Sequence, residues 1–321
     1  MISKLKHKVL AGGEITKEEA LELVNLAEVK TLELLGAANE IKEKYKGKKV
    51  DLCSIVSAKA GSCSEDCTFC SQSAHYNTGV QSYPLMAKED ILARAKEMEG
   101  SGAKHFGIVT SGRGVIDDQE FEQLVEAFRT IKEDTSLEVC ASLGTLDEDR
   151  AKKLSGVGLK RYNHNLETSE SHFANICTTH QYEDRVKTVR ALKARGVEVC
   201  SGGIIGLGES FEDRVDLAFT LKELDVDSIP LNILNPVEGT PVEDNRKVPP
   251  MEALKTAAIF RFINPKKTIK LCGGREKNLR DLQSLALLSG INGLLIGNYL
   301  TTQGRDVKED LQMIKDLGLE F

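Results

Sequence analysis

Apolar positions along this chain of 321 residues repeat with two different periods, and the change between them is the main structural signal. Before residue 50, Leu21, Val24 and Leu35 recur at roughly helical intervals, and Thr16 followed by Glu19 has the spacing of a helix capping box. From residue 50 onward, short β-rich runs alternate with amphipathic stretches. The pattern predicts an N-terminal helical extension over residues 1–49 and one further domain over residues 50–321.

The second pattern predicts eight strands with helices between them. The strands are expected at residues 52–57, 104–110, 137–143, 160–167, 197–205, 228–234, 268–272 and 293–296. The clearest helices are expected at residues 87–99, 118–132, 183–195, 212–224 and 251–262. Strands that alternate with helices form parallel sheets, and eight repeats in roughly 250 residues favour a closed barrel over an open doubly wound sheet. The predicted fold class is therefore α/β, a (β/α)8 TIM-type barrel.

Composition narrows the function mainly by exclusion. The chain carries 43 Lys and Arg against 49 Asp and Glu, a formal net charge of −6, and has no long basic block, which argues against a nucleic-acid partner. No apolar run approaches the roughly 18 residues of a membrane helix, and the first 20 residues lack the apolar stretch of a signal peptide. We therefore expect a cytoplasmic protein without a membrane partner, in which clustered cysteines are metal ligands rather than disulfides.

Three of the eight cysteines lie close together after the first predicted strand. Cys63, Cys67 and Cys70 have the spacing C-x3-C-x2-C. Three thiolates can hold three irons of a [4Fe-4S] cluster and leave the fourth iron open to substrate. The alternative is a zinc site completed by His75, although zinc sites favour paired C-x2-C units. A loop at this place lies on the C-terminal face of a barrel, where barrel enzymes hold their active sites.

A polar run interrupts the fourth predicted strand. Alternation puts Asn163, Asn165 and Glu167 on one face, with His164 on the other, where we expect it to pack rather than to act. Unpaired burial of an amide or carboxylate costs about 1–3 kcal/mol, so inward groups need partners. The run predicts a polar ligand, such as a cyclic urea or a ribose, or else a structural polar network inside the barrel.

A glycine-rich turn follows the fifth predicted strand. Gly202, Ile204, Gly206 and Glu209 belong to the run GGIIGLGE. Glycines at such a turn would let the backbone approach a bulky ligand closely. The run alone is weak evidence, since a dinucleotide fingerprint would require a helix to open inside it.

Together with Phe69, which precedes the last loop cysteine, these motifs resemble the radical S-adenosylmethionine superfamily. The resemblance implies that the open iron chelates S-adenosylmethionine, and that an electron from the cluster releases methionine and a 5′-deoxyadenosyl radical. By this resemblance the cofactor-binding residues are Phe69, Asn165, Glu167, Gly202, Ile204, Gly206, Glu209 and Asn232.

Four longer runs narrow the resemblance. YNHNLETS, VCSGGIIGLGE, PLNILNPVEGTP and GGRE, in this order from about residue 50 onward, resemble the biotin synthase family. The resemblance implies insertion of sulfur at C6 and C9 of dethiobiotin, with two S-adenosylmethionine molecules consumed and 5′-deoxyadenosine formed. Asn163, Asn165 and Asn232 would hold the substrate. A homodimer and an electron donor such as flavodoxin or ferredoxin are also implied.

The sequence departs from this family at a second, sulfur-donating cluster. Family members typically hold a [2Fe-2S] cluster with three cysteines and an arginine. Cys140 and Cys200 match two of these ligands, but Gly107 and Lys270 stand where the third cysteine and the arginine are expected. A [2Fe-2S] site with the usual ligands is therefore not expected.

The predicted barrel offers a replacement. Four cysteines fall on predicted strands one, three, five and seven, whose inward side chains share layers in such barrels. They are Cys53, Cys140, Cys200 and Cys272. We expect an auxiliary cluster of the four-iron type, with Cys53 as its fourth ligand or only a neighbour, and keep ordinary core cysteines as the alternative. Cys177 is expected to have no role.

Two other functions remain open. One is a different barrel enzyme of the same superfamily, of the kind that assembles a hydrogenase cofactor or pyrrolysine, although such enzymes lack the YNHNL run. The other is a non-catalytic iron–sulfur or zinc protein, which would have no need of an open iron, a glycine-lined adenosine pocket or inward amides.

Overall fold

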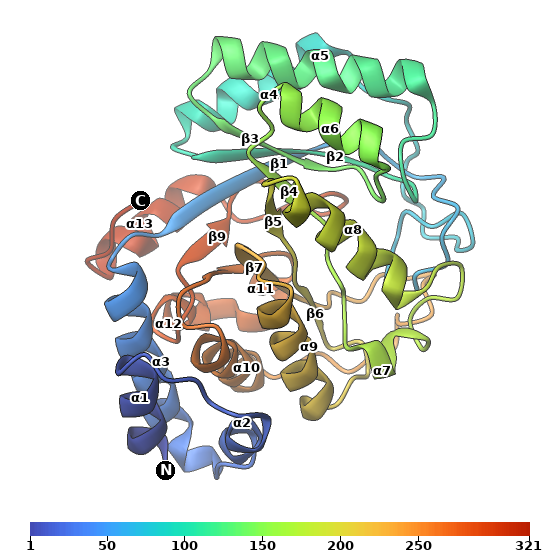
Figure 1. Cartoon of the computed structure of the whole chain (residues 1–321). Helices are drawn as coiled ribbons and strands as arrows, with labels where there is room; N and C mark the ends of the chain where they lie inside the picture. The colour runs from blue at the N-terminus through green and yellow to red at the C-terminus, as the bar shows by residue number, and fades with distance from the viewer.

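The strands of this protein form a closed parallel barrel in a computed structural model that describes residues 1–321 (Figure 1). The strands are β1 (Asp51–Lys59), β2 (His105–Thr110), β3 (Glu138–Ser142), β4 (Arg161–Asn163), β5 (Glu198–Cys200), β6 (Gly203–Ile205), β7 (Ser228–Ile233), β8 (Thr268–Leu271) and β9 (Gly293–Leu295). They pair in the order β5-β4-β3-β2-β1-β9-β8-β7-β6, and β5 also pairs with β7, which closes the ring. Because β5 and β6 are two parts of one barrel strand, the predicted (β/α)8 barrel is confirmed.

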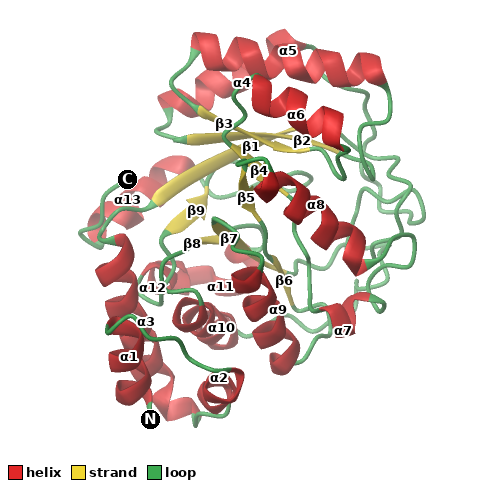
Figure 2. Ribbon diagram, in the orientation of Figure 1, coloured by secondary structure: helices red, strands yellow, loops and turns green.

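Helices surround the barrel on its outer side (Figure 2). The longer ones are α4 (Lys88–Gly100), α5 (Asp118–Asp134), α6 (Glu148–Gly156), α8 (Tyr182–Ala194), α9 (Phe211–Glu223), α10 (Pro250–Ile263) and α13 (Val307–Asp316). The short ones are α7 (Glu170–Phe173), α11 (Arg275–Leu279), η2 (Arg280–Leu282) and α12 (Gln283–Leu287). Each longer helix presents an apolar face to the strands, as Phe121, Leu124 and Phe128 of α5 do. Burying each such side chain contributes about 1.5–3 kcal/mol.

The N-terminal segment forms α1 (Ile2–Leu10), α2 (Lys17–Val24), η1 (Glu28–Lys30) and α3 (Thr31–Lys46). Helix α3 packs against α10 and α1 packs against α3, so the segment lies on the outside of the barrel. The expected capping box is present, since the Glu19 N–H donates to Thr16 Oγ1 at 3.2 Å and the Thr16 N–H donates to Glu19 Oε2 at 2.9 Å. None of the helices combines the length and apolar character needed to cross a membrane.

Two predicted strands are shorter than expected. The fifth barrel strand breaks at Ser201 and Gly202, where the Asn165 side chain accepts the Gly202 N–H at 3.2 Å in place of a neighbouring strand. A Cβ atom at Gly202 would lie 2.0 Å from the Pro230 carbonyl oxygen, so only glycine fits this close approach. The fourth strand ends at Asn163, and Glu167, which was expected to extend it, has a φ of 71°.

Candidate active site inside the barrel

One cavity of about 340 Å³ joins the cysteine loop to the interior of the barrel. Phe69 and Cys70 reach it from the loop that follows β1. Cys53, Cys140 and Cys200 line it from β1, β3 and β5, and Cys272 lines it from the position directly after β8. Residues from the loop and from four separate parts of the sheet therefore face one space, although the sequence separates them by up to about 220 positions.

The cysteine loop folds back on itself. The Cys63 N–H donates to the Gln72 carbonyl at 3.0 Å, the Ala74 N–H donates to the Cys63 carbonyl at 2.8 Å, and the Cys70 N–H donates to the Cys67 carbonyl at 2.9 Å. Cys63, Cys67 and Cys70 all line an adjoining cavity of about 240 Å³. Three thiols on one compact loop fit an iron–sulfur cluster, because soft thiolates are its usual protein ligands.

His75 lies outside this arrangement. Its side chain is exposed, and Nε2 lies 3.0 Å from the Ser64 carbonyl oxygen. The ring does not line either cavity that contains the loop cysteines. The donor set that faces the cavities is therefore three thiols, which suits iron better than a zinc site of three cysteines and a histidine.

The polar run after β4 lines the same cavity with alternate residues. Asn163, Asn165 and Glu167 face it, whereas Leu166 is fully buried in the packing outside. Burial raises the pKa of Glu167, and the charge of Arg185, whose Nη1 lies 3.7 Å from its carboxylate, acts against this. His164 is buried, as expected, and is absent from this cavity, but it lines the adjoining one that contains the loop cysteines.

Two asparagine amides are held by the backbone so that they face the cavity. Asn165 Oδ1 accepts the Gly202 N–H at 3.2 Å, and Asn232 Oδ1 accepts the Gly273 N–H at 2.9 Å. Their Nδ2 groups have only long contacts, of 3.4 Å to Glu167 and 3.5 Å to the Gly203 carbonyl. Each amide is thus oriented by its oxygen, which leaves its NH2 group available to a ligand.

Within the glycine-rich turn, Ile204 lines the cavity and the other predicted residues do not. Glu209 turns away, and its Oε1 accepts both the Gly206 N–H at 2.8 Å and Arg214 Nε at 2.6 Å. The carboxylate therefore fixes the shape of the turn, in which Gly206 has a φ of 105°. The sequence did not predict the role of Arg214. Its position near the start of the helix predicted at residues 212–224 was the one feature that could have placed it near this turn.

Arg185 was also missed. Its Nη1 donates to the Asn165 carbonyl at 2.9 Å and its Nε donates to His180 Nε2 at 3.0 Å, so it connects the polar run to the segment that follows α7. Arg185 lies 20 positions after Asn165 and has no periodic relationship to it. This contact depends on how the loop after β4 folds, and no local pattern indicates it.

The strand cysteines surround a buried ammonium group. Lys270 Nζ lies 2.7 Å from Cys53 Sγ and 3.1 Å from Asp51 Oδ2, and its side chain is 1% exposed. Burial raises the pKa of the Cys140 thiol, as it does for Cys200 and Cys272, and the positive charge of Lys270 acts in the opposite direction. Burial acts to lower the pKa of Lys270, but its close neighbours Cys53 and Asp51 raise that pKa overall.

Gly107 leaves room beside these thiols. It is the register partner of Cys140 in the β2–β3 ladder. A Cβ atom at this position would lie 3.9 Å from Cys140 Cβ and 3.1 Å from Ile55 Cγ2. A side chain here would therefore project beside the cysteines, and its absence widens the space between β1 and β3.

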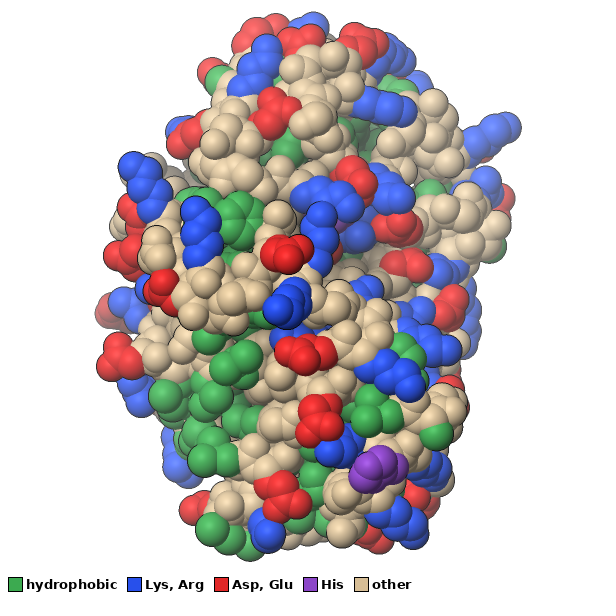
Figure 3. Space-filling model, turned by 90° about the vertical axis from the view of Figure 1, so that its left-hand side faces the viewer, with side chains coloured by type: hydrophobic (Ala, Val, Ile, Leu, Met, Phe, Trp, Pro, Cys, Tyr) green, Lys and Arg blue, Asp and Glu red, His purple; other side chains and the backbone are tan.

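Charged residues, rather than aliphatic ones, close the N-terminal end of the barrel below the cysteines. Asp51 Oδ1 lies 2.9 Å from His105 Nε2, and Arg161 Nη2 lies 3.0 Å from Glu198 Oε2. These four residues line a cavity of about 610 Å³ that opens on this end. Figure 3 faces this side of the molecule, where Lys and Arg side chains gather with acidic ones around a hollow. Interiors of such barrels are usually filled by Val, Ile and Leu, so the ionic layer is a distinctive feature of this one.

Comparisons with known proteins identify the family of this chain. The model of the radical SAM superfamily matches residues 59–221, and that of the Biotin and Thiamin Synthesis associated domain matches residues 230–320. The chain is 52% identical to the biotin synthase of Carboxydothermus hydrogenoformans over 100% of this chain and 99% of that protein. It is 54% identical to the biotin synthase of Pelotomaculum thermopropionicum over 99% of each.

The chain belongs to the biotin synthase family. It is therefore a radical SAM enzyme, and membership implies a [4Fe-4S] cluster and S-adenosylmethionine. Among solved structures, methylornithine synthase (PylB) superposes with a TM-score of 0.85 at 24% identity, covering 98% of this chain and 96% of that one. At this identity the likeness establishes the barrel fold and no more.

Proposed function

We propose that this member of the biotin synthase family inserts sulfur between C6 and C9 of dethiobiotin, with two S-adenosylmethionine molecules consumed per biotin. The observation that carries the proposal is the shared cavity. Phe69 and Cys70 of the loop line one part of it, and Cys53, Cys140, Cys200 and Cys272 line the part inside the barrel. A substrate between them would have the source of the radical on one side and the source of sulfur on the other.

The loop thiols of Cys63, Cys67 and Cys70 fit the [4Fe-4S] cluster, which with S-adenosylmethionine supplies the 5′-deoxyadenosyl radical when bound. Ile204 would pack against the adenine, and Glu167 would accept hydrogen bonds from ribose hydroxyls. Phe69, Asn165 and Asn232 would complete this side of the site. Gly202, Gly206 and Glu209 would act through the shape of the turn that carries Ile204.

The amides of Asn163, Asn165 and Asn232 would bind the ureido group of dethiobiotin. A cyclic urea offers two N–H donors and one carbonyl acceptor, and an asparagine amide can satisfy either kind. All three side chains line the cavity.

We further propose that Cys140, Cys200 and Cys272 hold an auxiliary cluster of the four-iron type, with Cys53 as a fourth ligand or a neighbour. A cluster with thiolate ligands carries negative charge, and Lys270 and Arg161 supply positive charge beside it. An iron without a protein ligand could carry an additional sulfide for transfer. Gly107 lies beside Cys140 and offers no ligand, so the third cysteine of the usual two-iron site has no counterpart at this position.

The test is anaerobic reconstitution with iron and sulfide, followed by assay with dethiobiotin and a flavodoxin or ferredoxin as reductant. Two four-iron clusters predict about eight irons per chain, against about six for the usual pair. Cys272→Ala should lose the auxiliary irons and biotin formation while retaining the loop cluster. Cys70→Ala is the reciprocal control and should lose the loop cluster. About six irons, unchanged in Cys272→Ala, would contradict the auxiliary site.

Two further measurements separate this function from its alternatives. Dethiobiotin-dependent formation of 5′-deoxyadenosine would distinguish a biotin synthase from other barrel enzymes of the superfamily. A change in the EPR spectrum of the reduced loop cluster on addition of S-adenosylmethionine would exclude a non-catalytic iron–sulfur carrier. Sedimentation of the reconstituted protein would test the expected homodimer.

A further inference from the structure

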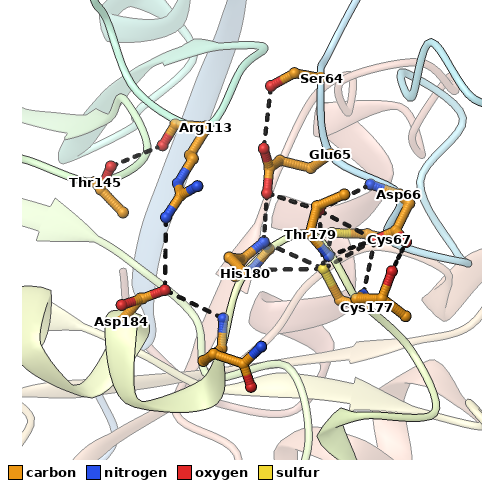
Figure 4. Close-up of polar contacts among 12 residues, drawn as sticks. Ser64, Glu65, Asp66, Cys67, Arg113, Thr145, Cys177, Thr179, His180 and Asp184 are labelled. Atoms are coloured by element: carbon orange, nitrogen blue, oxygen red, sulfur yellow. Dashed lines mark hydrogen bonds and ion pairs between the residues drawn. The ribbon is translucent and has the colours of Figure 1, made fainter.

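Cys177, to which the sequence assigned no role, contacts one of the loop cysteines. It is buried in the segment between α7 and α8, and its Sγ lies 3.8 Å from Cys67 Sγ (Figure 4). Cys177 lines neither the cavity of the strand cysteines nor the adjoining one. The eighth cysteine is therefore placed beside a proposed cluster ligand and outside the space where the reaction would occur.

The backbone holds the two cysteines side by side. The Thr68 N–H donates to the Ile176 carbonyl at 2.8 Å, so the peptide unit that follows Cys67 is bonded to the one that precedes Cys177. Asp66 strengthens this junction, since its Oδ1 accepts the Thr178 N–H at 2.9 Å. A disulfide has sulfurs about 2.05 Å apart, so the two sulfurs, which lie 3.8 Å apart, need to approach by less than about 2 Å to form the bond.

A third residue, His180, fixes the position of the Cys177 sulfur. His180 Nε2 accepts a hydrogen bond from Arg185 Nε at 3.0 Å, and because arginine only donates, the ring proton must be on Nδ1. Nδ1 lies 2.6 Å from Glu65 Oε2 and 3.2 Å from Cys177 Sγ. The proton is thus directed at the carboxylate and the sulfur together.

The same contacts argue against a zinc site. Ligand atoms of Cys67, Cys177 and His180 lie within 4.8 Å of one another, which is close enough for a metal. However, Arg185 occupies one ring nitrogen and Glu65 the other, so neither is free to bind an ion. Apart from the two sulfurs, the remaining donors are the carboxylates of Glu65 and Asp66, and both already accept hydrogen bonds: Glu65 from the His180 ring and Asp66 from the Thr178 N–H at 2.9 Å. This group of residues therefore does not present the four free ligands of a structural zinc site.

We propose that Cys67 and Cys177 form a reversible disulfide when the loop carries no cluster, an inference that rests on the proposed role of Cys67 as a cluster ligand. Two thiols lose two protons and two electrons, and one S–S bond forms. A peroxide accepts both electrons and both protons and is reduced to water. A dithiol reverses the step by forming its own disulfide.

The disulfide would protect Cys67 from irreversible oxidation and would control when the loop can bind its cluster. A cysteine that has lost its iron can be oxidised irreversibly to the sulfinic or sulfonic acid, whereas a disulfide can be reduced. While the bond is present only Cys63 and Cys70 remain as thiols, so a cluster that needs three ligands cannot assemble. Oxidation would therefore store the protein in a form that regains its cluster only after reduction.

The experiment begins with the full chain, stripped of iron by a chelator and reduced under anaerobic conditions. One portion receives an equimolar amount of hydrogen peroxide; free thiols are then alkylated and the protein is digested without reductant. We expect a peptide pair joined through Cys67 and Cys177, two hydrogens lighter than the separate peptides and released by dithiothreitol. The oxidised sample should bind no loop cluster until it is reduced, and the cluster-loaded protein should give no cross-link.

Variants and metal analysis make the test decisive. Cys177→Ser keeps a hydroxyl in place of the thiol and should bind the cluster. When the cluster-free variant receives an excess of peroxide, about two or more equivalents per thiol, Cys67 should become a sulfinic or sulfonic acid that dithiothreitol does not reduce, whereas the parent treated in the same way should keep Cys67 recoverable. Cys272→Ser is the matched control and should cross-link normally. Alkylation of both Cys67 and Cys177 after peroxide, a Cys67–Cys70 bond instead, or zinc that is lost in Cys177→Ser would each overturn the proposal. If Cys67→Ala retained the loop cluster, the assignment of Cys67 as a ligand would be wrong, whereas the cross-link found in the parent protein would still stand.

Discussion

Lys270 Nζ lies 2.7 Å from Cys53 Sγ inside the barrel, at the position where the resemblance to biotin synthases predicts an arginine ligand. The same ammonium group contacts Asp51 at 3.1 Å. The Lys270 ammonium group therefore lies between the strand cysteines and the ionic layer that closes the N-terminal end of the barrel. An ammonium group cannot bind iron, so its contribution to an auxiliary cluster would be electrostatic.

Replacing Lys270 by methionine tests this contribution. Lys270→Met removes the cation beside the cysteines and leaves Asp51 with less compensation, and breaking a buried ion pair costs about 3–5 kcal/mol. We expect the auxiliary irons to be lost and the loop cluster to remain, as measured by iron content and by EPR with S-adenosylmethionine. Lys267→Met, which removes a lysine that pairs with Asp225 outside the barrel, is the control. An unchanged iron content would show that Lys270 is not needed to hold the cluster.

Glu167→Gln tests the nucleoside side of the cavity. The substitution keeps the size of the side chain and removes the negative charge that would accept ribose hydroxyls. Hydrogen bonds to charged groups are worth about 1.5–3 kcal/mol, so the affinity for S-adenosylmethionine should fall about tenfold or more, with no loss of iron. Titration followed by EPR of the loop cluster gives the affinity. Glu170→Gln, an exposed position nearby, should bind normally; equal affinities in the two variants would remove Glu167 from the site.

The GGRE run has a structural role at its arginine. Arg275 and Asp310 are fully buried, and Arg275 Nη1 donates to Asp310 Oδ1 at 3.0 Å, which ties α13 to the end of β8. Asp310→Asn removes the fully buried counter-ion of Arg275 and leaves only Glu276, whose Oε1 lies 3.5 Å from Arg275 Nε, so it should lower the free energy of unfolding by about 3–5 kcal/mol. Urea denaturation of the cluster-free protein measures this change. Asp316→Asn, at the exposed end of the same helix, should have little effect.

Because of His164, we expect the free energy of unfolding to decrease in mild acid. Burial lowers the pKa of His164 to about 3, and the charges of Arg185 and His180 act in the same direction. The unfolded chain takes up this proton near pH 6.5 and the folded chain does not, so stability falls by about 1.4 kcal/mol per pH unit below about 6.5. His164→Leu should show a smaller loss between pH 7.5 and 5.5 in urea denaturation, whereas His7→Leu, at an exposed site, should behave as the parent. Equal losses in the parent and His164→Leu would contradict this account.

The fold was largely predictable because its signals are local. The β-rich runs after residue 50 predicted the position of every barrel strand. The alternation of Asn163, Asn165 and Glu167 predicted which side chains of the polar run face the cavity. The occurrence of cysteines on alternate strands likewise predicted that Cys53 and Cys272, far apart in sequence, would share one cavity.

What the sequence did not reveal depends on contacts between loops. Cys177 meets Cys67 only because the segment after α7 folds against the cysteine loop, and no periodicity relates the two. The fifth strand breaks where the Gly202 N–H donates to the Asn165 side chain. The alternation of the polar run predicts that Asn165 faces inward, but it does not predict this hydrogen bond. The sequence also did not indicate that Arg214 on α9 would hold the Glu209 carboxylate against the glycine-rich turn and outside the cavity.

Cys200 is the last residue of β5, and its barrel strand resumes only at Gly203. A cluster bound to Cys140, Cys200 and Cys272 would fasten this interrupted strand to β3 and to the end of β8. If its sulfide is consumed when product forms, that fastening weakens at the same time. Amides in β5 and β6 would then exchange their hydrogens faster after a turnover than before it, because the barrel would be locally less rigid once the protein has made biotin.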